Sequence, residues 1–179
     1  YGERGVGKTS LSQVVPLMLP KRVSRVHFLR KAADPNDDFN SIWRKVFREI
    51  RIASGPEAER GAYLSDDYQD REITPDDVVR ELSNFGPNDV PIVVVDEFNE
   101  VKDPGTPRLM ANAIKGLSDQ GVNATIIIVG VADDVNELIA GHESISRCCE
   151  EVMMPRMGED ELRDVVDSRI ARLGMHIDS

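Results

Sequence analysis

Residues 2–10 read GERGVGKTS, and this stretch decides the fold. It fits the pattern G-x-x-x-x-G-K-[ST], with Gly2, Gly7, Lys8 and Thr9 at the fixed positions. Glycines let backbone N–H groups turn toward phosphate oxygens, and a helix that starts behind the loop favours negative charge at its N-terminus. In such loops the lysine reaches the β and γ phosphates and the hydroxyl binds Mg²⁺. The stretch therefore predicts a site for a nucleotide and Mg²⁺.

The position of this loop in the sequence raises a second expectation. A phosphate loop normally follows a buried strand, whose end aims the loop at its ligand. Here only Tyr1 precedes the loop. We therefore expect the sequence to be a fragment or a truncated form of a longer domain, without that domain's first strand.

Composition limits the classes of protein to consider. The chain has 179 residues, which suits one domain with a single core, and its 40% apolar and 30% charged residues are ordinary for a folded domain. A net charge of −10 argues against a general electrostatic grip on nucleic acid or on an anionic membrane. No apolar run approaches the ~20 residues of a membrane span. The adjacent Cys148 and Cys149 are poorly placed for a structural disulfide, so we expect reduced thiols in a cytoplasmic protein.

Segments with strand character alternate with amphipathic helical segments along the chain. This order predicts an α/β fold in which a parallel sheet is covered by helices on both faces. The expected strands lie within residues 22–30, 91–100, 124–134 and 151–155. The expected helices lie at residues 8–19, 39–50, 75–85, from 107 onward, through Leu138 and Ile139, and at about 159–173. Residues 53–72 are polar and without a period, which predicts a surface loop.

Two acids follow the most apolar of the expected strands. Ile92–Val95 lead directly into Asp96 and Glu97. At the carboxyl end of a strand in a nucleotide-binding fold, the first acid of such a pair holds Mg²⁺, usually through water. The second acid can polarise the attacking water. The pair therefore indicates nucleotide hydrolysis rather than binding alone.

Four segments together resemble a known family. GERGVGKTS (2–10), IVVVDEFNE (92–100), IIIVGVADD (126–134) and SISRCCEEVMMPRMGEDELRDVV (144–166) follow the order and spacing of AAA+ ATPases. The sequence is most similar to origin-recognition and initiator ATPases and to related bacterial AAA ATPases. The resemblance covers nearly the whole chain and implies a P-loop NTPase three-layer sandwich. It divides the chain into a nucleotide-binding core at residues 1–156, without its first strand, and the start of a helical lid at residues 157–179.

The resemblance also implies roles for individual residues. Asp96 and Glu97 are the Walker B acids, and Thr9 joins Asp96 in holding Mg²⁺. Asp133 stands at the sensor-1 position, where the family often has Asn; an acid there would repel the γ-phosphate unless a water or a cation intervenes. The ATP-binding loop comprises Gly2, Glu3, Arg4, Gly5, Val6, Gly7, Lys8, Thr9 and Ser10.

Two arginines follow in the same comparison. Arg147 falls where the family places an arginine finger that reaches the ATP of a neighbouring subunit, which implies a homo-oligomer. Arg156 lies where the chain would turn into the lid, and its role stays open. A sensor-2 arginine would lie beyond Ser179.

Two functions are compatible with these motifs. The first is an ATP-hydrolysing AAA+ module that couples nucleotide state to conformational change or subunit assembly. The alternative is a STAND-like signalling NTPase that turns over slowly and controls an effector domain outside this sequence. Arg147 separates them, because such switches usually lack an inter-subunit finger. A nucleotide or small-molecule kinase is disfavoured, because kinases with this loop rarely need the acid pair, and nothing here supplies a DNA-binding part.

Overall fold

The computed structural model describes residues 1–19, 25–52, 61–132, 145 and 147–175. These residues form a three-stranded parallel sheet in the order β1-β2-β3. Its strands are β1 (Arg25–Ala32), β2 (Asp89–Asp96) and β3 (Thr125–Ile128). The central strand β2 is buried from Pro91 to Asp96, because both faces of the sheet are covered. Burial of both faces explains the unbroken apolar run of β2. The parallel pairing of the three strands confirms the predicted parallel sheet.

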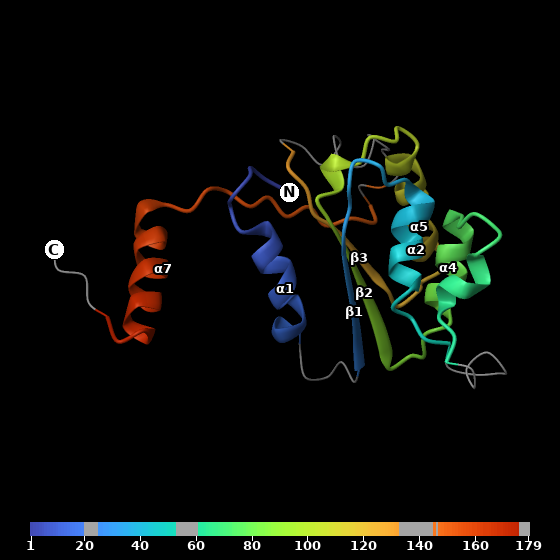
Figure 1. Cartoon of the computed structure of the whole chain (residues 1–179), viewed down its shortest axis with the longest axis horizontal. Coiled ribbons are helices and arrows are strands. Elements are labelled where there is room, and N and C mark those ends of the chain that lie inside the picture. Colours follow the sequence, from blue (N-terminus) through green and yellow to red (C-terminus); the bar gives the residue numbers. More distant parts are fainter. Residues whose placement is uncertain (20–24, 53–60, 133–144, 146, 176–179) are drawn as a thin grey trace.

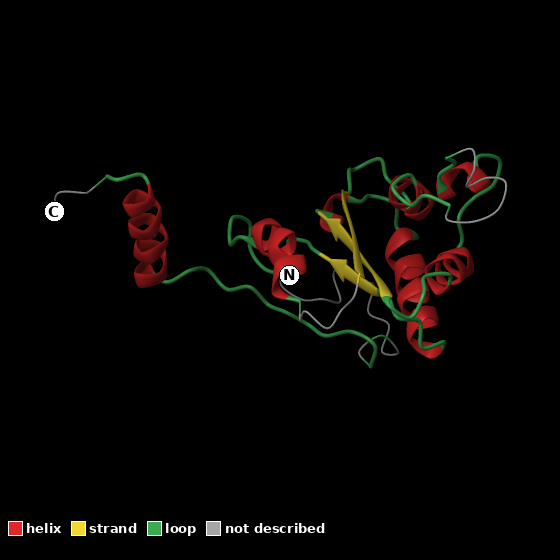
Figure 2. Cartoon of the chain, turned by 90° about the horizontal axis from the view of Figure 1, so that it is seen from below, coloured by secondary structure: helices red, strands yellow, loops and turns green. Residues whose placement is uncertain are grey.

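Helices cover the two faces of the sheet in separate layers (Figure 1). Helix α1 (Lys8–Met18) lies on one side, and α2 (Phe39–Phe47), α4 (Pro75–Ser83) and α5 (Thr106–Asp119) lie on the other (Figure 2). The three-layer arrangement is the one predicted from the sequence. In the part of the chain that the structure describes, no helix is both long enough and apolar enough to cross a bilayer.

The larger core lies between the sheet and the layer of α2, α4 and α5. The rings of Phe39, Trp43 and Phe47 follow one another at helical spacing along α2, with centroids 6.2 and 5.9 Å apart. All three are buried, together with Val93 and Val95 of β2. The apolar stripe predicted for residues 39–50 therefore packs in the core.

Part of the predicted surface loop is also in this core, which corrects the sequence-based expectation. Residues Leu64–Tyr68 form a 3₁₀ helix, and the ring of Tyr68 packs against Phe47 with centroids 5.2 Å apart. The Tyr68 hydroxyl donates a hydrogen bond to Glu81 at 2.6 Å. A segment of five residues is too short to show a period, so its contribution to the core was not visible in the sequence. Residues 53–60 lie outside the described residues.

The predicted strand at residues 151–155 is also corrected. This segment is not a strand in the structure, but it makes two backbone hydrogen bonds to the first residue of the chain. The Tyr1 amino group donates to the Val152 carbonyl at 2.8 Å, and the Met154 N–H donates to the Tyr1 carbonyl at 2.8 Å. Tyr1 is thus paired as a strand residue would be, although too few residues pair to form a ladder.

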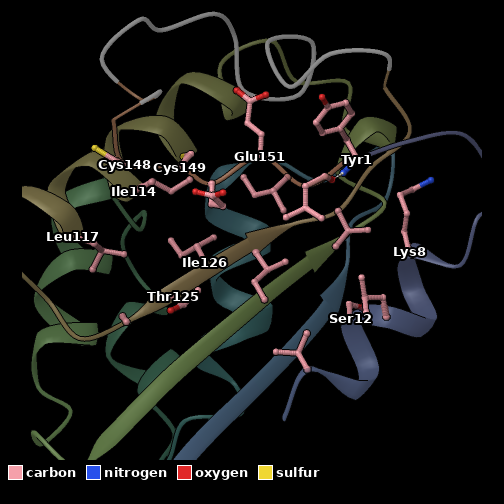
Figure 3. Close-up of a pocket in the computed structure, with 18 of the residues that line it drawn as sticks. Tyr1, Lys8, Ser12, Ile114, Leu117, Thr125, Ile126, Cys148, Cys149 and Glu151 are labelled. Atoms are coloured by element: carbon pink, nitrogen blue, oxygen red, sulfur yellow. Dashed lines mark hydrogen bonds between the residues drawn. The ribbon is translucent and has the colours of Figure 1, made fainter. Parts of the chain in front are cut away.

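A groove of about 630 Å³ lies between α1, β3 and the segment that pairs with Tyr1 (Figure 3). Ile114 and Leu117 of α5 and Ile126 of β3 line it. Among the described residues no strand pairs with the outer edge of β3, so Ile126 is only half-buried instead of buried as predicted.

Helix α7 (Glu159–Arg172) lies apart from these layers in both overall views. Leu162, Val165 and Val166 on this helix are all exposed. The helix and its C-terminal glycine, Gly174 with φ of 68°, match the prediction for residues 159–173. The helix predicted through Leu138 and Ile139 lies outside the described residues.

Candidate functional site

The glycine-rich loop has a backbone that other residues would strain. Gly2 has φ of 147°, and a Cβ atom there would lie 2.4 Å from the Met154 carbonyl oxygen. Gly7 has φ of 90° and precedes α1 as its N-cap. In the described structure no side chain caps this helix end, so its first N–H groups are open to an anion. The loop and helix thus have the backbone geometry that phosphate binding would require, and the binding role of the loop stays a prediction.

Lys8 is held at the loop by backbone carbonyls. Its Nζ donates hydrogen bonds to the carbonyl oxygens of Gly2, at 2.7 Å, and Glu3, at 2.5 Å. Burial lowers the pKa of the Lys8 ammonium, Asp96 opposes that shift, and Arg4 adds to it. The amine is therefore placed over the loop and in the electrostatic reach of Asp96.

A direct hydrogen bond joins the glycine-rich loop to the acid pair. The Thr9 hydroxyl donates to Asp96 Oδ2 at 2.8 Å, across 87 positions of sequence. The Glu97 N–H donates to Asp96 Oδ1 at 2.9 Å. Asp96 is only 2% exposed, so its carboxylate depends on these donors in place of water. The two predicted metal ligands, Thr9 and Asp96, are in contact.

Glu97 has an unusual backbone conformation. With φ of 56° and ψ of 32°, it is the single non-glycine residue with positive φ among those the structure describes. A left-handed conformation costs a residue with a Cβ roughly 1–2 kcal/mol, and such strain is concentrated at functional sites. The Glu97 side chain is exposed rather than buried like that of its neighbour. The turn therefore separates the two acids, with Asp96 inside and Glu97 facing the solvent.

A polar pocket of about 770 Å³ brings these groups together. Gly5, Gly7, Lys8, Thr9, Ser10 and Arg4 line it from the loop and α1. Asp96 and Glu97 line it from the end of β2. The remaining lining comes from three neighbouring turns, through Ala33, Asp34, Pro35, Asn99, Glu100, Gly130 and Val131.

Other predicted site residues lie outside this pocket. Gly2 and Val6 are buried within the loop, and the exposed Glu3 accepts a hydrogen bond from Arg156 Nε at 2.6 Å. Arg147 is exposed in the turn after Ile145. Asp133 lies outside the described residues, so its sensor role stays a prediction.

The sequence interpretation gave no role to two residues at this edge of the sheet. The Arg30 guanidinium donates to Asp96 Oδ2 at 2.5 Å, and Asn99 Oδ1 accepts the Val131 N–H at 2.8 Å. Asn99 thereby links the turn after β2 to the segment after β3. The signal for Arg30 was its place near the carboxyl end of a parallel strand, where ligands bind in open α/β sheets.

These residues fit a nucleotide with Mg²⁺. The loop N–H groups and Lys8 would hold phosphates, and Thr9 with Asp96 would hold the ion. In the described part of the chain, no group of three or more His, Cys, Asp or Glu side chains could hold a metal alone. Mg²⁺ usually binds through one or two carboxylates together with substrate phosphates.

Comparison with solved structures shows the fold. The chain is similar to the ORC1 protein of Aeropyrum pernix, solved in complex with DNA, with a TM-score of 0.65 and 20% identity over 96% of this chain and 42% of that one. It is similar to the ORC2 protein of Aeropyrum pernix in its ADP form, with a TM-score of 0.59 and 18% identity over 96% and 45%. The C. elegans PCH-2 protein gives a TM-score of 0.53 and 17% identity over 99% and 40%.

The chain thus spans less than half the length of each of these proteins. No protein-family model matches the sequence, and comparison with curated protein sequences finds no match. The likeness therefore concerns the fold, and it agrees with the loop, the acid pair and the strand order described above. This chain therefore has the α/β fold of a P-loop NTPase or AAA+ core, which it shares with the ORC1 and ORC2 proteins.

Proposed function

We propose that this chain is the ATP-binding and ATP-hydrolysing part of a Mg²⁺-dependent AAA+ module, acting in the cytoplasm. The observation that carries the proposal is the hydrogen bond from Thr9 to Asp96, at 2.8 Å. This hydrogen bond links the glycine-rich loop to the acid pair, and both line one pocket. Neither motif alone indicates that the two lie together. The likeness to an ADP-bound protein of the same fold supports the choice of an adenine nucleotide.

The residues would divide the work as follows. The loop N–H groups and Lys8 bind and orient the phosphates, while Thr9 and Asp96 hold Mg²⁺. The bound ion would neutralise charge on the phosphate oxygens. The Glu97 carboxylate, on the solvent side of the pocket, orients a water and accepts its proton. Burial of Asp96 and exposure of Glu97 suit these different tasks.

Two further roles belong to the same proposal. Asp133 would respond to the γ-phosphate through a water or a cation, from the segment that follows β3. Arg147 would act on the nucleotide of a neighbouring subunit, which its exposed position permits. The module would then couple nucleotide state to subunit contacts or conformational change.

Hydrolysis by a matched pair of variants tests the catalytic assignment. Glu97→Gln keeps the size of the side chain and removes the base, so ATP should still bind while phosphate release falls at least tenfold. Glu100→Gln is the control, because Glu100 lines the same pocket and is given no catalytic role. Equal turnover by Glu97→Gln and the parent chain would reject Glu97 as the base.

The dependence of turnover on protein concentration tests Arg147. If Arg147 acts between subunits, turnover per chain rises with concentration, and mixing Arg147→Ala with Lys8→Ala chains restores part of the activity. Arg147→Ala alone should lower turnover while nucleotide affinity stays near that of the parent chain. Turnover that is independent of concentration, without rescue on mixing, would favour the signalling switch over the assembling ATPase.

A further inference from the structure

Asp96 has a positively charged neighbour that the proposed chemistry does not use. Arg30 lies on β1, and the parallel register pairs Ala32, two residues later, with Asp96 of β2. Arg30 is therefore close enough for its guanidinium to donate to Asp96 Oδ2 at 2.5 Å. The same oxygen accepts the Thr9 hydroxyl at 2.8 Å. Arg30 and a divalent cation would therefore compete for the same carboxylate group.

Burial makes this ion pair matter electrostatically. The side chain of Asp96 is 3% exposed and that of Arg30 is 28% exposed, so water screens the pair weakly. A carboxylate that is neutralised by a guanidinium attracts a second cation less strongly than a free carboxylate does. Lys8 adds further positive charge near the same group, as its electrostatic interaction with Asp96 shows.

One nitrogen of the Arg30 guanidinium also lacks a hydrogen-bond partner among the described residues. Within the part of the chain that the structure describes, the Arg30 Nε is buried and has no hydrogen-bond acceptor. A buried donor without an acceptor is unfavourable, so Arg30 is held in place chiefly by its contact with Asp96. Among the described residues, Asp96 is the one hydrogen-bond and ion-pair partner of the Arg30 side chain.

We propose that Arg30 is a positioning residue that competes with Mg²⁺ for Asp96. Arg30 holds and neutralises the carboxylate while the site is empty, and it gives up its contact with the carboxylate when Mg²⁺ arrives with the nucleotide. A divalent cation alone cannot displace it, because only the nucleotide brings the phosphate charge that offsets Lys8 and Arg30. The proposal rests on the proposed function, and it makes metal binding conditional on nucleotide binding.

Metal binding without nucleotide is the first test, with Mn²⁺ as the probe and electron paramagnetic resonance as the readout. The parent chain should bind no Mn²⁺ at Asp96 at concentrations up to about 1 mM. Arg30→Met and Arg30→Gln, which remove the charge, should bind Mn²⁺ at least about tenfold more tightly, and adding Asp96→Asn should abolish that gain. Arg30→Lys keeps the charge and should resemble the parent chain.

A second arginine of β1 supplies the control. Arg25 is 73% exposed at the other end of the strand, where it lies 3.6 Å from Asp89, so Arg25→Met should leave Mn²⁺ binding unchanged. Circular dichroism shows which variants fold. If the neutral variants do not fold, the parent chain still decides, since nucleotide-independent Mn²⁺ binding that Asp96→Asn removes would overturn the proposal.

Calorimetry with ADP separates this proposal from the proposed function. The ratio of the ADP dissociation constants in EDTA and in Mg²⁺ should rise at least about tenfold in Arg30→Met and stay unchanged in Arg25→Met. A ratio that is unchanged or smaller in a folded Arg30→Met chain would mean that Arg30 only braces Asp96, and would overturn the proposal. If the parent chain binds no ADP in either buffer, the proposed function fails, while the Mn²⁺ measurements still test the competition.

Discussion

Replacing Thr9 by valine should destabilise the fold. The substitution keeps the branched shape and removes the hydroxyl that donates to Asp96 at 2.8 Å. A hydrogen bond to a charged group contributes about 1.5–3 kcal/mol. In Thr9→Val, Asp96 still accepts hydrogen bonds from Arg30 and from the Glu97 N–H. The lower end of this range therefore applies, and the free energy of unfolding should fall by about 1.5 kcal/mol.

Urea unfolding can measure this loss, because Trp43 is the one tryptophan of the chain and is fully buried. Trp43 fluorescence and far-UV circular dichroism should give coincident transitions if α1 unfolds together with the core. Thr9→Ser restores the hydroxyl and should stay within about 0.5 kcal/mol of the parent chain, as should Thr125→Val on the exposed start of β3. If Thr9→Val is as stable as the parent chain, or if Thr9→Ser is as destabilising as Thr9→Val, the Thr9 hydroxyl does not stabilise the fold.

Substitutions in the loop and in the first turn of α4 test two further points. Gly2→Ala should lower both stability and nucleotide affinity, because the new Cβ would lie 2.4 Å from the Met154 carbonyl oxygen. Gly5→Ala is the control, because nothing lies within 4 Å of its new Cβ and only the cost of the backbone conformation remains. Equal effects of the two substitutions would contradict the predicted clash at Gly2. Burial alone would raise the pKa of Asp77, but hydrogen bonds from Thr74, Arg71 and Arg80 lower it well below its ordinary value. The ionised Asp77 therefore stabilises the fold above the unfolded pKa of about 3.9, and this stabilisation is lost as the pH falls below that value. The urea concentration at the unfolding midpoint should consequently decrease less between pH 5 and 3 in Asp77→Asn than in the parent chain. An equal decrease in both chains would argue against this role of Asp77.

The sheet and the acid pair could be predicted because their signals are local. Ile92–Val95 form one apolar run, which is typical of a strand that is covered on both faces. The apolar residues of α2 recur at helical spacing within that single helix. Thr9 and Asp96 could be brought together in advance because each belongs to a motif with a known partner. These predictions needed no knowledge of distant packing.

The features that escaped prediction depend on contacts between distant segments. Arg30 became part of the site through the register that pairs Ala32 with Asp96, which no single stretch of sequence contains. Tyr68 lies in the core because its ring packs against Phe47, although its own segment is polar. The half-burial of Ile126 reflects the groove beside β3, whereas its apolar sequence indicated a fully buried strand.

Calorimetric titration with Mg²⁺ and a slowly hydrolysed ATP analogue tests most directly whether the loop holds nucleotide phosphates. The parent chain should bind one analogue per chain, and Lys115→Ala, which removes an exposed lysine from α5, should bind equally well. Lys8→Ala should bind at least about tenfold more weakly, since a charge-assisted hydrogen bond contributes about 1.5–3 kcal/mol. Equal affinity of Lys8→Ala and Lys115→Ala for the analogue would contradict the account.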